Sequence, residues 1–300
     1  MFFGSSVAVV TPMHPDGAID FEAWNRLLDF HLSGGTAAVV VGGTTGESAT
    51  ITDAELKQLV IAARDFARGR MAIIAGAGVS STAATVERTR WLGDLEIDGL
   101  LVVTPAYVKP TQEGLFQHYS AVAAAAKVPV VLYNVPGRTG VDMLPATVAR
   151  LAALPRIVAI KEAVAGAARV RDILALAPTF TVLSGDDATC REAVLAGARG
   201  VISVTANVAP KGMSEMIEAA IVGDAARAAA LDAPLARLHQ DLFVEGNPIP
   251  VKWALQRMGM IRGGIRLPMT PLAESFHGRV AAAMDSAGLK QDPRGFQAHA

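Results

Sequence analysis

Residues 156–166, RIVAIKEAVAG, contain a short apolar run that ends on a lysine. Residues 157–160 are apolar and three of the four are β-branched, which is typical of a strand buried on both faces. The next residue is Lys161, whose ammonium group is strongly hydrated in water. The run therefore predicts a buried strand that delivers a charged side chain to its end.

Seven further apolar runs repeat this plan along the chain. Amphipathic, helix-favouring segments separate the runs, and Asp20 and Thr52 are suitable N-caps for the first two helices. Strand alternating with helix implies right-handed βαβ units and a parallel sheet. Eight units predict a closed (β/α)8 TIM barrel, an α/β fold; an open doubly wound sheet is the alternative, but no G-x-G-x-x-G follows the first run. The eight runs are residues 6–12, 36–46, 71–78, 99–105, 129–136, 157–163, 180–187 and 200–207.

The strand pattern stops after about Gly223. We therefore expect a barrel at residues 1–223, which carries the active site, and a small C-terminal all-helical appendage at residues 224–300. Helical patterns cover residues 224–243, 248–259 and 271–288, and Pro234 is expected to kink the first of them. The segment from about residue 289 lacks periodicity and is predicted to be a loose tail.

Composition limits the classes of partner. The formal net charge is −1, which argues against a surface built for nucleic acid or for an anionic membrane. Hydrophobic residues make up 51% of the chain, yet no uninterrupted apolar run reaches the length of a membrane span. The first basic residue is Arg26, so the N-terminus has no charged leader region. We expect a soluble cytoplasmic protein.

Lys161 is the first candidate for a catalytic residue. In a barrel the chemistry takes place at the ends of the strands, in the loops that lead to the next helices. Four apolar residues precede Lys161, so we expect it inside the barrel mouth; the alternative is a side chain that extends into water. Burial lowers a lysine pKa, and a neutral amine condenses with a ketone or aldehyde to form a Schiff base. The sequence predicts covalent catalysis at this residue.

Tyr133 and Arg138 follow the neighbouring predicted strand, in LYNVPGRTG at residues 132–140. The Tyr133 hydroxyl can donate and accept the proton that Schiff-base formation requires, and the Arg138 guanidinium can bind a carboxylate with two parallel hydrogen bonds. Taken alone, the first is equally a core tyrosine with a satisfied hydroxyl, and the second a solvated loop arginine. Their convergence with Lys161 at one barrel mouth favours a site.

Two further loops add polar groups to the expected mouth. The turn GGTTGES at residues 42–48 exposes backbone N–H groups and the hydroxyls of Thr44 and Thr45, which suit an anion. A phosphate site would have a similar turn, but the P-loop lysine pattern is missing, so a small carboxylate is expected. Tyr107, in TPAYVKP at residues 104–110, is by default an interface residue.

The remaining reactive groups have simpler interpretations. Asp186 and Asp187 are adjacent carboxylates at the start of a helix, where capping is commoner than metal binding, and no His/Glu cluster accompanies them. Cys190 is the single cysteine, which excludes an internal disulfide; we expect it to be buried and inert. Neither a metal nor another cofactor is predicted.

The order and spacing of GTTGE, YNVPGRTG and IKEA give the sequence a family resemblance. With IIAGAG, SGDDA, GVISVTANVAP and NPIPVKWAL, the chain resembles the dihydrodipicolinate synthase / N-acetylneuraminate lyase family of class I, pyruvate-dependent aldolases. The resemblance covers residues 1 to about 288 and is strongest to the dihydrodipicolinate synthase branch. Together these motifs are highly specific; alone, only YNVPGRTG comes near that.

The resemblance implies roles for individual residues. Lys161 matches the lysine that forms a Schiff base with pyruvate, and Tyr133 matches the general acid/base. Thr44, Tyr133 and Tyr107 match a proton relay, in which Tyr107 reaches in from a neighbouring subunit.

Four residues match substrate contacts of the family. Thr45 matches a ligand of the pyruvate carboxylate, and Ile202, with Gly185 nearby, matches main-chain contacts to the bound ketoacid. Arg138 matches the arginine that receives the carboxylate of L-aspartate 4-semialdehyde. Lyases acting on sialic acid usually lack this arginine, so it favours the synthase branch.

The implied activity is a lyase reaction of diaminopimelate and lysine biosynthesis. Pyruvate and L-aspartate 4-semialdehyde condense through the Schiff base and the product cyclises, with no PLP or metal. The family usually forms homotetramers built from tight dimers, across which Tyr107 would be shared. Two alternatives remain open: a sister aldolase acting on N-acetylneuraminate or a 2-keto-3-deoxy sugar acid, and a silent paralogue that only binds ketoacids.

One departure from the family concerns feedback control. Lysine-inhibited members have two histidines, an asparagine, a glutamate and a tyrosine at their lysine site. The aligned positions here are Asp53, Leu56, Ser80, Ala84 and Ala106. These side chains lack most of the expected donors and the expected carboxylate, so weak or absent inhibition by lysine is the hypothesis.

Overall fold

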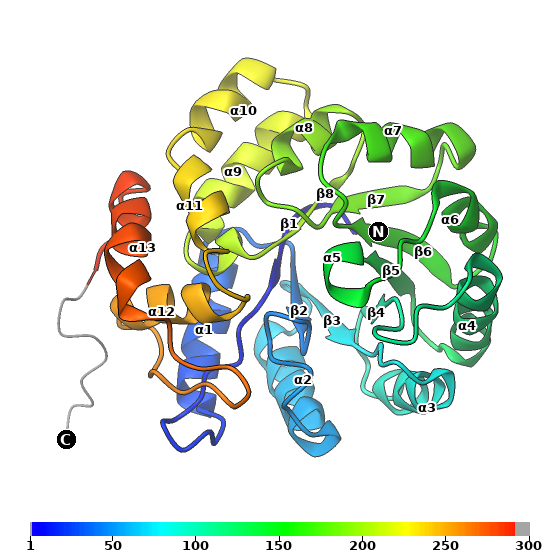
Figure 1. The fold of residues 1–300 in the computed structure, drawn as a ribbon, viewed down its shortest axis with the longest axis horizontal. Coiled ribbons are helices and arrows are strands. Elements are labelled where there is room, and N and C mark those ends of the chain that lie inside the picture. The colour runs from blue at the N-terminus through cyan, green and yellow to red at the C-terminus, as the bar shows by residue number, and fades with distance from the viewer. Residues whose placement is uncertain (1, 292–300) are drawn as a thin grey trace.

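Eight parallel strands form a closed barrel in the order β1 to β8, and β1 pairs with β8 to close it. A computed structural model of the chain describes residues 2–291. Helices surround the ring of strands (Figure 1). The predicted TIM barrel is therefore confirmed, and each of the eight apolar runs overlaps one strand. The strands are β1 (Gly4–Ala8), β2 (Ala38–Val41), β3 (Ala72–Gly76), β4 (Gly99–Val103), β5 (Val130–Asn134), β6 (Ile157–Glu162), β7 (Thr181–Ser184) and β8 (Gly200–Ser203).

The helices follow the strands as predicted. Those of the barrel are α1 (Phe21–Ser33), α2 (Asp53–Ala67), α3 (Thr82–Leu92), α4 (Gln112–Ala125), α5 (Pro136–Thr139), α6 (Pro145–Ala152), α7 (Ala167–Leu176), α8 (Cys190–Leu195) and α9 (Pro210–Ile221), with a 3-10 turn η1 (Thr205–Asn207). Beyond them lie α10 (Ala225–Asp232), α11 (Ala236–Asp241), α12 (Ile249–Arg257) and α13 (Glu274–Ser286).

Both predicted N-caps are confirmed. The Asp20 carboxylate accepts a hydrogen bond from the Ala23 N–H at 2.9 Å, at the start of α1. Thr52 and Glu55 form a reciprocal capping box at the start of α2, in which each side chain bonds to the backbone of the other residue. Local sequence thus fixes where these two helices begin.

Side chains on the strands divide into two layers, because successive residues of a strand point to opposite faces. The inner cluster takes at least one residue from every strand, and it includes Tyr133, Ala159 and Ile202. A larger apolar cluster lies between the strands and the helices. Residues 131, 133, 159 and 161 consequently face the barrel interior, and Asn134 and Glu162 face the helical layer.

Helices α10 to α13 lie to one side of the barrel in Figure 1. The predicted kink at Pro234 is a complete break, since α10 ends at Asp232 and α11 begins at Ala236. Helix α10 packs on α9 and α8, so the chain has no gap in its packing at residue 223. The expected domain boundary at this residue stays a prediction. No helix among residues 2–291 is both long and apolar enough to span a membrane.

Most of the predicted loose tail lies outside the described residues. The described part, 289–291, is not loose: the Gln291 amide donates hydrogen bonds to the Ala281 carbonyl at 3.1 Å and to Asp285 Oδ1 at 2.7 Å. These bonds attach the end of the described chain to α13.

Arg266 joins the appendage to the barrel. Its guanidinium donates to both carboxylate oxygens of Glu55, at 2.5 and 2.9 Å, and also to the carbonyls of Gly17 and Thr50. Hydrogen bonds from Arg266 are the largest cause that lowers the pKa of Glu55 from 4.5 to about 2. A loop of the appendage is thus held against the start of α2.

This contact predicts an acid-dependent loss of stability. Because the pKa of Glu55 is lowered in the folded state, its contribution is complete above about pH 4.5 and disappears as the pH falls toward 2. We expect Glu55→Gln to reduce the free energy of unfolding at pH 7 by about 1–2 kcal/mol. Urea unfolding at several pH values measures the difference from the unchanged chain. A difference that does not shrink between pH 4.5 and 2 would contradict the assignment.

Candidate active site

Lys161 and Tyr133 are direct neighbours inside the barrel. They are paired residues of the neighbouring strands β5 and β6. Lys161 is buried, with only 5% of its surface exposed. Its Nζ lies 4.5 Å from the centre of the Tyr133 ring. The predicted burial of Lys161 is confirmed. An amine beside a phenol suits Schiff-base chemistry. The amine attacks a carbonyl carbon, and the hydroxyl donates protons to, and accepts protons from, the oxygen of the resulting carbinolamine.

Gly185 keeps space open for the lysine side chain. It follows β7, and a Cβ atom placed on it would lie 3.0 Å from both Cγ and Cε of Lys161. A larger residue would therefore push against the amine-bearing chain. The sequence singled out Gly185 for a main-chain contact with the ketoacid; the structure adds this steric reason for a glycine.

The glycine-rich turn after β2 approaches Tyr133. Thr44 and Tyr133 line one small pocket at the mouth, together with Gly42, Gly43 and Ser48. Thr45 is buried, and its Oγ1 accepts a hydrogen bond from the Asn247 side-chain amide at 2.9 Å. The turn thus places Thr44 near Tyr133, and Asn247 of the appendage holds the hydroxyl of Thr45.

Asn247 is a site residue that sequence reasoning missed. Besides its bond to Thr45, its main-chain carbonyl accepts a hydrogen bond from Arg138 Nη2 at 3.2 Å. Its Oδ1 is buried and has no partner within the described residues. The signal was weak because Asn247 belongs to the appendage and not to a strand end. It nevertheless links the arginine of the β5 loop to the threonine of the β2 turn.

A second polar cluster supports the β5 loop from outside the barrel. The Asn134 amide donates to Asp142 at 2.7 Å and to Glu162 at 3.0 Å, and its Oδ1 accepts from the Met143 N–H. Arg169 completes the cluster by donating to Asp142 at 2.6 Å. These bonds close the loop that carries Arg138. Burial is the main cause that raises the pKa of Glu162 from 4.5 to about 7, while its hydrogen bonds act in the opposite direction.

Ile202 and Tyr107, the two remaining predicted site residues, differ from each other in burial. Ile202 is buried in the same inner cluster as Tyr133, and its main-chain contact with a ketoacid stays a prediction. Tyr107 is 94% exposed, has a left-handed backbone with φ of 73°, and does not line the small pocket that Thr44 and Tyr133 share. The role across a subunit boundary also stays a prediction.

The acidic pair after β7 differs in part from its predicted capping role. Asp186 does accept from the Thr189 N–H at the start of α8. Asp187 instead accepts from the N–H groups of Val204 and Thr205, both at 2.9 Å, at the start of η1 after β8. The expectation that both cap α8 is wrong. In the folded chain the end of β8 lies beside Asp187, and the N–H groups that follow β8 bind its carboxylate instead.

Cys190 is fully buried, as predicted, and burial raises the pKa of its thiol. Among residues 2–291 no group of three His, Cys, Asp or Glu side chains is placed to hold a metal ion.

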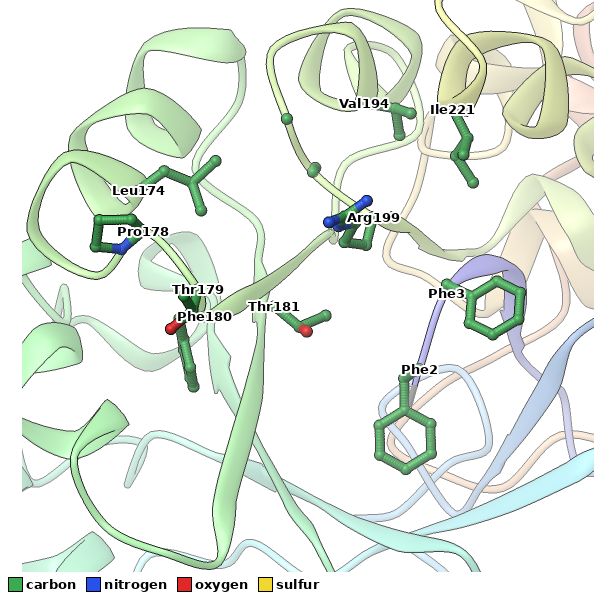
Figure 2. A pocket seen from close by; sticks show the side chains of 12 residues that line it. Phe2, Phe3, Leu174, Pro178, Thr179, Phe180, Thr181, Val194, Arg199 and Ile221 are labelled. Carbon is green, nitrogen blue, oxygen red and sulfur yellow. The ribbon is translucent and has the colours of Figure 1, made fainter.

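A larger cavity, of about 640 Å³, lies elsewhere (Figure 2). It is lined by Phe2 and Phe3 before β1 and by residues around β7 and β8, with Arg199 as the charged member of its lining. These are the amino-terminal ends of the strands, opposite the expected catalytic end. Its walls supply neither an amine nor a phenol. This cavity is larger than the pocket at the mouth, but the chemistry favours the mouth at Lys161.

Similarity to known proteins places the chain in a family. The sequence matches the model of the Dihydrodipicolinate synthetase family over residues 1–287. The chain belongs to this family. The resemblance predicted from GTTGE, YNVPGRTG and IKEA is therefore confirmed.

Individual members are similar over nearly their whole length. The 4-hydroxy-tetrahydrodipicolinate synthase of Methylococcus capsulatus is 53% identical, covering 96% of this chain and 100% of that protein. A chloride-inhibited dihydrodipicolinate synthase from Acinetobacter baumannii, solved in complex with pyruvate, has a TM-score of 0.95 and 48% identity, covering 97% and 100% of the two chains. A monomeric dihydrodipicolinate synthase variant has a TM-score of 0.94 and 41% identity, covering 96% and 98%.

The polar cluster of Asn134, Asp142, Glu162 and Arg169 outside the barrel predicts a pH effect on stability. Because the pKa of Glu162 is raised to about 7, the folded chain holds a proton that the unfolded chain releases near pH 4.5. Stability should therefore fall as the pH rises from about 4.5 to 7, by at most about 3 kcal/mol. Glu162→Gln keeps the shape without the titration, so its melting temperature should vary less over this range. Equal pH dependence in the two proteins would refute this assignment.

Proposed function

We propose that this chain condenses pyruvate with L-aspartate 4-semialdehyde and is a 4-hydroxy-tetrahydrodipicolinate synthase. The observation that carries the proposal is the buried Lys161 amine beside the Tyr133 ring. The predicted activity is the one that the relatives at about 50% identity are named for. Pyruvate is the ligand bound by the Acinetobacter relative, which supports its assignment as the first substrate.

The reaction begins with attack of the Lys161 nitrogen on the C2 carbonyl carbon of pyruvate. Tyr133 delivers a proton to the resulting carbinolamine oxygen, which leaves as water and gives the imine. Loss of a proton from the methyl carbon gives an enamine, with the imine nitrogen accepting the electron pair. The enamine carbon attacks the aldehyde carbon of the second substrate, whose oxygen takes up a proton.

Release of the product restores the enzyme. The amine that came from aspartate semialdehyde attacks the imine carbon, and Lys161 leaves as a free amine. This exchange closes a six-membered ring that carries the hydroxyl group from the aldehyde. The lysine itself accepts the electrons of the enamine step, so the scheme uses no other cofactor.

The surrounding residues divide the remaining tasks. Thr45 and the N–H groups of its turn bind the pyruvate carboxylate, assisted by the main chain near Gly185 and Ile202. Thr44 passes protons between Tyr133 and solvent, and Tyr107 of a neighbouring copy extends this relay. Arg138 binds the carboxylate of the aldehyde substrate, oriented by the Asn247 carbonyl.

The exposure of Tyr107 supports assembly. A tyrosine that is 94% exposed at left-handed φ lies beside exposed Val108, and a second copy would cover both. We therefore propose a homotetramer of tight dimers. The monomeric relative shows that this fold also occurs without a partner, so the assembly belongs to the proposal. We also propose that the enzyme works in the cytoplasm.

Two variants of the chemistry are the alternatives. A sister aldolase would use the same lysine and tyrosine with a sugar-derived aldehyde, and Arg138 argues for a carboxylate-bearing acceptor instead. A silent paralogue would bind ketoacids without turnover, and it would have no use for a buried amine beside a phenol.

Lys161→Ala tests the proposed chemistry. The unchanged enzyme should turn over pyruvate with aspartate semialdehyde, and should not use N-acetylmannosamine or glyceraldehyde efficiently. The variant should lose several orders of magnitude in rate, because positioning alone does not replace a covalent intermediate. Borohydride with pyruvate should trap an adduct on the unchanged chain and none on the variant. A trapped adduct without synthase turnover would support a sister aldolase, and no adduct at all would sink the Schiff-base proposal.

The residues aligned with the family's lysine site predict the response to lysine. Leu56 is buried against Gly42, Asp53 is paired with Arg88, and the Ser80 hydroxyl donates to the Ala106 carbonyl. The polar groups that remain are thus already bonded within the chain, and Leu56 offers no donor to an effector. We expect less than twofold inhibition by 1 mM lysine, which means a dissociation constant above about 1 mM and a binding free energy weaker than about −4 kcal/mol. Strong inhibition at sub-millimolar lysine in the rate assay would overturn this expectation.

A further inference from the structure

Glu47 ends the glycine-rich turn and is buried in an unusual way. Its side chain is completely inaccessible, although Glu is almost never fully buried unless it is paired. Its partner is Lys252 of α12, whose Nζ forms a short ion pair with Oε1. The other oxygen accepts from the Arg266 N–H at 3.2 Å. A residue of the catalytic face is therefore fixed to the appendage through both of its carboxylate oxygens.

The backbone of Glu47 shows why an anchor is needed. Its φ is 61°, a left-handed conformation that costs a residue with a side chain about 1 kcal/mol or more. In this conformation the Glu47 N–H donates to the Thr44 carbonyl at 3.1 Å and closes the turn. The Thr11 hydroxyl holds the turn from the other side by donating to the Gly46 carbonyl at 2.7 Å. Movement of Glu47 would thus displace Thr44 and Thr45 directly.

A buried ion pair is a poor source of net stability, because the loss of hydration of two charges offsets most of their attraction. An apolar pair of similar volume would hold α12 against the barrel as well. What the ion pair adds is direction: the carboxylate has one position in which both oxygens are satisfied. Such a constraint is useful where a turn must present two hydroxyls to a reacting substrate.

We propose that Glu47 and Lys252 are positioning residues, through which helix α12 holds the Thr44–Thr45 turn in the geometry that binds pyruvate. The inference rests on the proposed function, since it assigns the turn to the pyruvate carboxylate. Neither residue touches the reacting atoms, so each acts through the two threonines. Asn247, five residues before Lys252, holds Thr45 from the same part of the appendage.

The test replaces the pair without leaving a lone buried charge. Glu47→Gln combined with Lys252→Met removes both charges and keeps similar volumes. We expect the apparent dissociation constant for pyruvate, from the concentration dependence of borohydride trapping on Lys161, to rise at least tenfold, and KM for pyruvate to rise with it. Trapping at saturating pyruvate should remain complete, because Lys161 and Tyr133 are unchanged. KM for aspartate semialdehyde should change less.

A matched control lies inside the appendage. Arg279 and Asp241 pair at 2.6 Å between α13 and α11, away from the turn. Asp241→Asn with Arg279→Met should alter the melting temperature without altering pyruvate affinity. If the first double variant melts lower but keeps the affinity of the unchanged enzyme, the pair is only structural and the inference is overturned.

Glu47→Gln alone serves if the double variant does not fold. Burial lowers the pKa of Lys252, and removing the carboxylate also removes the contacts that raise it, so the variant makes the neutral amine more favourable. The single variant should weaken pyruvate trapping in the same direction, and unchanged affinity would count against the inference. The unchanged enzyme distinguishes the two levels of proposal. If it traps no pyruvate, the proposed function itself has failed; if it traps pyruvate and the variants match it, only the positioning role has.

Discussion

The register between β5 and β6 is the constraint on which the site depends. It places Lys161 opposite Tyr133 on the inner face of the barrel, where the lysine amine lies 4.5 Å from the ring centre. A shift of one residue in either strand would turn one of these side chains toward the helices. The apolar residues that precede Lys161 fix this register, because their own burial decides which face is inner. Packing of the barrel and placement of the amine are therefore one event.

The same alternation explains why polar groups occur in two separate layers. Inside, the amine and the phenol meet beside the space that Gly185 leaves open. Outside, Asn134 and Glu162, the next residues on the same two strands, tie down the loop that carries Arg138. One residue of each strand thus supplies a candidate catalytic group, and its neighbour serves loop geometry. This division lets a short strand end supply both a reactive group and its support.

Local pattern and spacing predicted much of this molecule. The eight strands, the caps at Asp20 and Thr52 and the burial of Lys161 all depend on neighbouring residues or on simple periodicity. The contacts that escaped prediction join distant parts of the chain. Asn247 bonds to Thr45 across 202 positions and Lys252 pairs with Glu47 across 205, and no period relates them. Asp187 was misassigned for the same reason, since its donors follow the next strand, at the start of η1.

The dependence of the β2 turn on α12 has a consequence during synthesis. A nascent chain that has emerged through β8 already holds all eight strands, the amine and the phenol. The partners of Thr45 and Glu47 are residues 247, 252 and 266, which at that stage are still in the ribosomal exit tunnel or have not yet been translated. Until those residues have been translated, the left-handed turn lacks its contacts with the appendage and is held only by the Thr11 hydroxyl and by hydrogen bonds within the turn. The final geometry of the turn would then arise only after the last strand has formed, when α12 and the loop at Arg266 join the barrel.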